Sequence, residues 1–126
     1  MARGNAEIVR EVYAGFARRE FPASAFHEDI CWETNPNLPD AGVHRGLDAV
    51  RTYFADWVGG WHAVETEIER LTERGDKVIA LLHGSFQLSA GSKPFESDFG
   101  HVWTLRDGKV VYVRATADRT DPELAQ

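Results

Sequence analysis

A chain of 126 residues is the size of one domain with a sizeable hydrophobic core, and we treat residues 1–126 as that domain. Its formal charge of −6 argues against nucleic acid or an anionic membrane surface as a partner. Cys31 is the single cysteine, so an intrachain disulfide is excluded, and the first residues lack the apolar segment of a signal peptide. With no apolar run of membrane-spanning length either, we expect a cytoplasmic protein.

Three helical segments are expected in the first half of the chain. Apolar residues recur at helical spacing from Asn5, which can cap a helix, to the pair Arg18-Arg19, whose charges suit a helix C-terminus. Pro22 begins a short second helix that continues to about Phe26. A third helix runs from Leu47 to Val58, where Gly59-Gly60 ends it.

Strands are expected around and after these helices. A short one covers Ile30 to Thr34 and is followed by a loop from Asn35 to Gly46. Two long alternating segments then run from His62 to Thr72 and from Lys77 to Leu88, and Ser97 to Asp118 forms a hairpin. Helices followed by a meandering antiparallel sheet predict an α+β fold. A strongly twisted sheet of this kind leaves one concave face, against which the helices pack.

The hairpin places a histidine on one of two faces, depending on its turn. A two-residue Asp107-Gly108 loop would put His101 beside Arg114. A three-residue loop over 106–108, with a left-handed glycine, would instead put it on the face of Ala115. We predict the three-residue loop because it matches apolar to apolar residues on one side and polar to polar on the other. His101 then lies on the inner face, among aromatic rings and beside small alanines.

A histidine in that position suits a small-molecule pocket. His101 can serve as a general acid or base, or donate a hydrogen bond to a carbonyl group, and its ordinary pKa of about 6.5 predicts turnover that titrates near neutrality. The alternative is a core histidine whose ring is hydrogen-bonded to a neighbouring hydroxyl or backbone carbonyl group. Seven rings are candidates either for the pocket wall or for plain core packing: Tyr13, Trp32, Trp57, Trp103, Tyr53, Phe86 and Phe99.

Two carboxylates are weaker candidates for a base. Asp118 ends the last strand and either reaches the mouth of the pocket or is a solvent-exposed residue or cap. Glu33 follows Trp32 and points the other way, so it faces the pocket only if that strand is bulged. The other histidines lack the spacing of metal ligands, and we expect no metal and no cofactor.

Three segments resemble the SnoaL-like polyketide cyclases, which belong to the superfamily of nuclear transport factor two and ketosteroid isomerase. They are Glu28 to Glu33, Gly42 to Val50 and His101 to Val110. The resemblance covers nearly the whole chain. It implies a cone-shaped barrel whose open mouth leads into an apolar pocket, usually in a dimer. It leaves the activity open, because the same cone hosts isomerases, cyclases, dehydratases, epoxide hydrolases and non-catalytic binders.

The resemblance also assigns positions, residue by residue. His101 lies where ketosteroid isomerases place the protonated aspartate of their oxyanion hole. The general base of those isomerases falls near Thr34 or Asn35, and we expect both among the ligand contacts of the pocket. Neither side chain accepts a proton at neutral pH, which argues against steroid isomerisation. The acid/base aspartate of the cyclases lies on the last strand, where the inward residues here are alanines and the nearest carboxylate is Asp118.

Two functions follow from this reasoning. The first is a cyclase- or isomerase-type enzyme in which His101 polarises a carbonyl group of an apolar compound or moves a proton next to it. The second is a protein of the same fold that binds a small ligand without turnover. In either case we expect a homodimer through the convex face of the sheet, where apolar residues of the Lys77–Leu88 strand and Val102 form a patch.

Overall fold

Two α-helices and a six-stranded sheet make up the part of the chain that the computed structural model describes, residues 4–34 and 42–116. A short 3₁₀ turn, η1, covers Ala23–Ala25 between the first helix and the first strand. The helices are α1 (Asn5–Ala17) and α2 (Leu47–Gly59). The strands are β1 (Phe26–Glu33), β2 (Val43–Arg45), β3 (Ala63–Arg74), β4 (Lys77–Gln87), β5 (Phe95–Arg106) and β6 (Lys109–Thr116).

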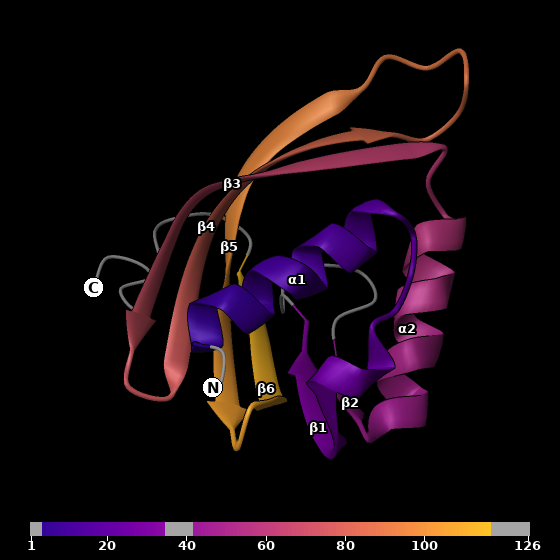
Figure 1. Ribbon diagram of the computed structural model, residues 1–126. Coiled ribbons are helices and arrows are strands. Elements are labelled where there is room, and N and C mark those ends of the chain that lie inside the picture. Colours follow the sequence, from indigo (N-terminus) through magenta and orange to yellow (C-terminus); the bar gives the residue numbers. More distant parts are fainter. Residues whose placement is uncertain (1–3, 35–41, 117–126) are drawn as a thin grey trace.

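The sheet has the order β2-β1-β6-β5-β4-β3 and is antiparallel except for the parallel pair of β1 and β6. It curves around α1, which lies along its concave side, while α2 packs near β1 and β2 (Figure 1). This confirms an α+β fold with a curved, mixed and mainly antiparallel sheet. The sheet is open, so the cone is not a closed barrel, and two α-helices replace the three that we predicted.

The second predicted helix, which was to begin at Pro22, is missing because core packing overrides the local signal there. Only three residues after it form a 3₁₀ turn, and Phe26 already belongs to β1, four residues before the predicted start of that strand. The Phe26 ring is 2% exposed and stacks on Phe21 at 4.8 Å between centroids. An extended backbone at Phe26 therefore delivers this ring to the core.

Part of the predicted loop from Asn35 to Gly46 is a strand. Val43–Arg45 forms β2, which pairs antiparallel with the end of β1, so that His44 lies opposite Trp32. The three-residue strand forms because its backbone groups find partners on the otherwise open edge of β1. It extends the sheet by one strand and leads directly into α2.

The turn between β5 and β6 differs from the prediction. The side of the sheet on which His101 lies is nevertheless the predicted one. The loop has two residues, Asp107 and Gly108, with φ of 52° and 79°, and Arg106 pairs with Lys109 across it. Positive φ at both positions is typical of a type I′ turn, which glycine favours. By itself this loop would send His101 to the opposite face.

A bulge at Val111 restores the predicted facing. Leu105 pairs with Val110, but Thr104 pairs with Tyr112, so one residue of β6 has no partner and the register shifts. Because side chains alternate along a strand, one extra residue exchanges the two faces beyond it. His101 therefore pairs with Ala115 on the concave side.

The two faces of the sheet carry separate apolar clusters. The main core lies on the concave side, between the sheet and the helices, and includes Val9 and Val12 of α1 and Trp103 of β5, all fully buried. A second cluster on the convex face joins Ile79 and Val102, with half-buried Leu81 against them. Ile79 and Val102 are 3% and 2% exposed, so this cluster leaves little apolar surface open to solvent on the convex face.

Candidate active site

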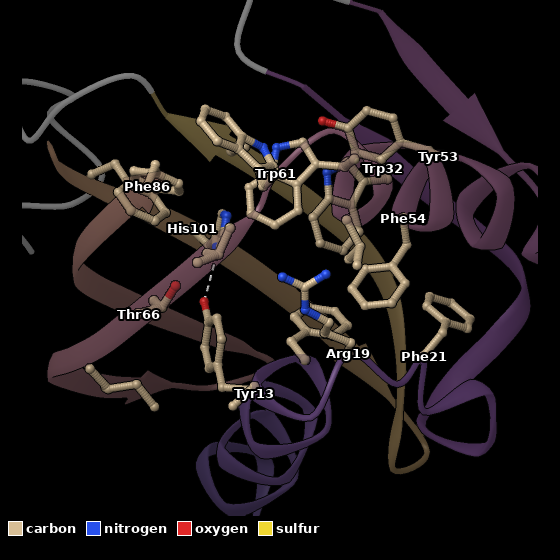
Figure 2. A pocket seen from close by; sticks show the side chains of 18 of the residues that line it. Tyr13, Arg19, Phe21, Trp32, Tyr53, Phe54, Trp61, Thr66, Phe86 and His101 are labelled. Carbon is tan, nitrogen blue, oxygen red and sulfur yellow. Dashed lines mark hydrogen bonds between the residues drawn. The ribbon is translucent and has the colours of Figure 1, made fainter. Parts of the chain in front are cut away.

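A cavity of about 590 Å³ opens on the concave side between α1, α2 and strands β3 to β6. This volume lies within the range of pockets that hold drug-sized ligands. Rings dominate its lining, and several of them meet around His101 (Figure 2). Seven of the residues that we predicted for the site contribute to the wall: Tyr13, Trp32, Tyr53, Trp57, Phe86, Phe99 and His101.

His101 is enclosed by rings from three elements. Its imidazole stacks on Tyr13 at 5.8 Å between centroids and meets the edge or face of Trp32 at 5.9 Å and Phe99 at 5.6 Å. Ala115, opposite it on β6, leaves space above the ring because its side chain is a single methyl group. The histidine therefore reaches the cavity from an apolar environment.

A directed chain of hydrogen bonds fixes this imidazole. The indole Nε1–H of Trp103 can only donate, and it donates to the Tyr13 hydroxyl oxygen at 2.8 Å. The Tyr13 hydroxyl in turn lies 2.6 Å from Nδ1 of His101 (Figure 2). Among the described residues, Nδ1 of His101 is the only acceptor within hydrogen-bond distance of the Tyr13 hydroxyl, so the hydroxyl proton points to Nδ1. This assigns Nδ1 as an acceptor and places the ring proton on Nε2.

Burial stabilises the neutral forms along this chain. Desolvation lowers the pKa of His101 to about 4, so the ring is uncharged at neutral pH. Desolvation also raises the pKa of Tyr13 well above 10, although the hydrogen bond from Trp103 opposes this shift. Tyr13 therefore keeps its proton and continues to donate it to Nδ1.

The cavity side of the ring is consequently a hydrogen-bond donor. No described residue hydrogen-bonds Nε2 of His101, and the ring lines the cavity, so the Nε2–H group is free to meet a ligand. An acceptor such as a carbonyl oxygen fits this group. A proton-accepting role at Nε2 does not, because that nitrogen already carries a proton. The lowered pKa of His101 predicts that turnover does not titrate with this histidine near neutrality, which differs from the expectation from the sequence.

The lowered pKa of His101 predicts a dependence of stability on pH. In the unfolded chain the imidazole binds a proton below about pH 6.5, whereas in the fold it stays neutral down to about 4. Acid therefore favours unfolding across this window, and the His101 contribution to the free energy of unfolding should fall by about 1 kcal/mol between pH 7 and 5.5. Urea denaturation of wild type and His101→Gln at both values measures it. An equal pH slope in both proteins would contradict the assignment.

Two predicted site residues, Trp103 and Thr34, lie away from the cavity surface. Trp103 is fully buried behind Tyr13 and acts on the site through its hydrogen bond. Thr34 is 3% exposed. Its hydroxyl donates to the backbone carbonyl of Gly42 and accepts from the N–H of the same residue, so it ties the end of β1 to the residue before β2. These two are structural supports where we had expected ligand contacts.

Glu33 does not face the cavity. The irregularity in β1 lies between Phe26 and Cys31, before the position at which a bulge would turn Glu33 inward. Its carboxylate accepts a hydrogen bond from the Tyr112 hydroxyl on the other face of the sheet. Burial, together with this carboxylate, raises the pKa of Tyr112 to about 12. The remaining candidates, Asn35 and Asp118, lie outside the described residues.

Several residues of the cavity wall were not predicted. Phe54, Trp61 and Phe95 add rings to it, and Arg19 adds a charged group. The helical spacing of α2 offers a signal for Phe54, one position after Tyr53. No sequence pattern marks Trp61, which follows the end of α2, or Arg19, whose charge we attributed to the helix dipole.

Neither a metal site nor a membrane span emerges in the described ranges. No group of three or more histidine, cysteine, aspartate or glutamate residues within 4–34 and 42–116 is arranged to hold a metal ion. No helix in these ranges is long and apolar enough to cross a membrane.

The family model of the SnoaL-like domain matches residues 9–113, which is most of the chain. The chain belongs to the SnoaL-like domain family. This confirms the resemblance that the three sequence segments indicated. No curated protein sequence matches this SnoaL-like chain.

Solved structures with the same fold accompany the family match. An NTF2-like protein from Burkholderia thailandensis is 28% identical, with a TM-score of 0.78 over 98% of both chains. TerC, co-crystallised with polyporic acid, is 24% identical, with a TM-score of 0.81 over 90% of this chain and 91% of TerC. A putative SnoaL-like polyketide cyclase from Jannaschia is 14% identical, with a TM-score of 0.75 over 91% and 89%. These likenesses establish the fold of this SnoaL-like domain.

Proposed function

We propose that this SnoaL-like domain is an enzyme that binds a flat, largely apolar carbonyl compound and promotes proton transfer next to the carbonyl group. The observation that carries the proposal is the hydrogen-bond chain from Trp103 through Tyr13 to His101. It presents a neutral imidazole with its Nε2–H group toward an aromatic cavity. The role of His101 is therefore that of a donor to the carbonyl oxygen.

Such a donor accelerates enolisation for an electrostatic reason. No described residue of the wall is placed to take the proton, so the base comes from solution, as hydroxide or the buffer anion. When this base removes a proton from a C–H bond next to the carbonyl group, negative charge develops on the carbonyl oxygen. A fixed donor aimed at this oxygen from an apolar wall stabilises the developing charge more than mobile water does, because it does not have to reorient. Tyr13 does not pass its own proton on, because its raised pKa makes a tyrosinate unfavourable. It holds the tautomer of His101.

A relative supports a small molecule as the ligand. TerC shares this fold and was co-crystallised with polyporic acid. We extend to this chain the expectation that the concave side of the fold receives a small organic compound. The wall of rings supplies apolar contact to such a ligand, and His101 orients its oxygen.

Deuterium exchange tests the proposal without knowledge of the natural substrate. 2-Tetralone is a flat aromatic ketone with acidic C–H bonds beside its carbonyl group. In D₂O the protein should accelerate the incorporation of deuterium at these carbons above the buffer rate, as followed by NMR or mass spectrometry. Binding of the ketone with exchange at the buffer rate would contradict the enzymatic proposal.

Binding without turnover is the second candidate. It is favoured by one observation, namely that no carboxylate occurs among the described residues that line the cavity. In this case His101 orients a ligand oxygen and nothing removes a proton. Quenching of tryptophan fluorescence by 2-tetralone, together with exchange at the buffer rate, is the expected result for a binding protein.

We also propose that the chain forms a homodimer through the convex face of the sheet. Ile79, Val102 and Leu81 form an apolar cluster there, remote from the cavity. Ile79 and Val102 are already buried within one chain, and half-buried Leu81 is the member of the cluster whose remaining surface a second copy would cover. Sedimentation velocity should give the mass of two chains, and Leu81→Glu should shift it to the mass of one. A monomer in the wild type would contradict this proposal.

A further inference from the structure

The cavity is positively charged in a protein whose net charge is −6. Two of its lining residues, Arg10 and Arg19, are cations, and none of the described lining residues is an aspartate or glutamate. His101 adds no charge, since its pKa of about 4 leaves it neutral at pH 7. A wall of this composition favours a ligand that carries negative charge of its own.

Arg19 occupies a backbone position that normally suits glycine. At the end of α1, the N–H of Glu20 bonds the carbonyl of Gly15 at 2.9 Å and the N–H of Arg19 bonds that of Phe16 at 2.9 Å. This is the Schellman pattern, whose residue after the cap takes a left-handed conformation and is usually glycine. Arg19 has a φ of 60° there. The fold accepts an unfavourable conformation and gains a long cationic side chain at this point.

The side chain of Arg19 is held over the cavity. Its Nη2 donates to the backbone carbonyl of His62 at 2.7 Å, just after α2, so the guanidinium spans from one helix end toward the other. Figure 2 shows the guanidinium pointing into the pocket, between Tyr13 and Trp32. A hydrogen bond to a carbonyl group fixes the side chain but does not neutralise its charge.

The charge of this guanidinium has no counterion in the described part of the chain. No ion pair joins Arg19 to a described carboxylate, whereas the adjacent Arg18 pairs with Glu20 at 3.2 Å outside the cavity. A guanidinium has five N–H donors, and only one of them is used by His62. The others match the two oxygens of a carboxylate, which arginine binds in a bidentate manner.

Resting on the proposed function, we infer that the ligand of this pocket is an aromatic carboxylic acid, whose carboxylate pairs with Arg19 while a separate carbonyl oxygen meets His101. The apolar body of such a compound lies between the two groups, against the rings of the wall. Arg19 thereby selects acids over neutral compounds of the same shape. Arg10, also on the wall, adds to the positive potential.

A matched pair of probes tests the inference. Anthraquinone-2-carboxylate and anthraquinone-2-carboxamide share the flat body and the ring carbonyl groups, and only the first carries charge at pH 7. Calorimetry or tryptophan quenching should give a dissociation constant at least tenfold lower for the acid, with the difference shrinking as salt is raised. Equal affinities for both probes would overturn the inference and leave the proposed function standing.

Variants at the same position separate charge from folding. Arg19→Gly should keep the melting temperature at or near that of the wild type, because glycine suits this backbone, yet remove the preference for the acid. Arg19→Lys should keep part of the preference, since lysine retains the positive charge but cannot bind a carboxylate in the bidentate manner of a guanidinium. Arg18→Gln, outside the cavity, should keep all of it. A full preference in Arg19→Gly would overturn the inference, and binding of neither probe to the wild type would overturn the pocket function along with it.

Discussion

His101→Ala should lower the rate of 2-tetralone deuterium exchange by about 10²- to 10³-fold, the loss observed when one oxyanion donor is removed from an active site. The reason is geometric, because the Nε2–H group is the donor that the hydrogen-bond chain presents to the cavity. Stability should change little, since water can enter the cavity and accept from Tyr13. The exchange assay, run beside denaturation curves, measures both effects.

A matched variant makes this result specific. His101→Gln retains an acceptor for the Tyr13 hydroxyl and an amide N–H₂ group near the position of Nε2, so it should recover exchange to within about tenfold of the wild type. The acceleration over the buffer rate should be independent of pH between 5.5 and 8 in this variant and in the wild type, because the pKa of His101 is about 4. Exchange in His101→Ala at the wild-type rate would exclude His101 as the donor.

Tyr13→Phe should destabilise the fold by about 1–3 kcal/mol, because the Trp103 indole N–H would remain buried without an acceptor. The same change removes the proton that holds His101 in its Nε2–H form, so exchange should also slow. Tyr112→Phe is the control, since it removes a tyrosine hydroxyl bonded to Glu33 on the opposite face. That variant should leave exchange unchanged.

A double variant isolates the indole contribution. Trp103→Phe removes the N–H group, so adding Tyr13→Phe in that background should destabilise less than it does in the wild type. Residues that share a hydrogen bond show coupling energies on the order of 1 kcal/mol. Urea denaturation of the four proteins gives this coupling. Additive losses would show that the hydroxyl does not satisfy the indole.

Much of the architecture was predictable from periodicity and family resemblance. The apolar spacing of α1 and α2 and the alternation of β3 to β6 mark elements that the structure contains. The short elements were not predictable. β2 exists because β1 offers it a free edge, and the expected helix at Pro22 is lost because Phe26 is needed in the core. Both outcomes depend on partners that are distant in the sequence.

The side of the sheet on which His101 lies was predicted correctly, although the predicted turn was wrong. Matching apolar to apolar residues across the hairpin identified the right face. The device that achieves it is a two-residue turn combined with a bulge at Val111, and not a three-residue turn. The hydrophobic pattern thus predicts which face is buried. It does not predict whether a longer turn or a bulge sets the register.

The chemistry of the site depended on contacts that sequence does not reveal. Tyr13 and His101 are 88 residues apart, and only the fold brings them within hydrogen-bond distance. Of the roles predicted for His101, that contact favours the donor to a carbonyl group over the general acid or base. The place of Arg19 on the cavity wall could not be predicted from the sequence either, because the direction of its side chain depends on the backbone conformation at the end of α1.

The protonation state of His101 is the central claim, and the ¹⁵N NMR spectrum of its imidazole tests it most directly. At pH 7 the protein should show a proton on Nε2 and a bare Nδ1, and this state should persist until the pH approaches 4. A ring that carries its proton on Nδ1, or that becomes charged near pH 6.5, would contradict the account of this pocket.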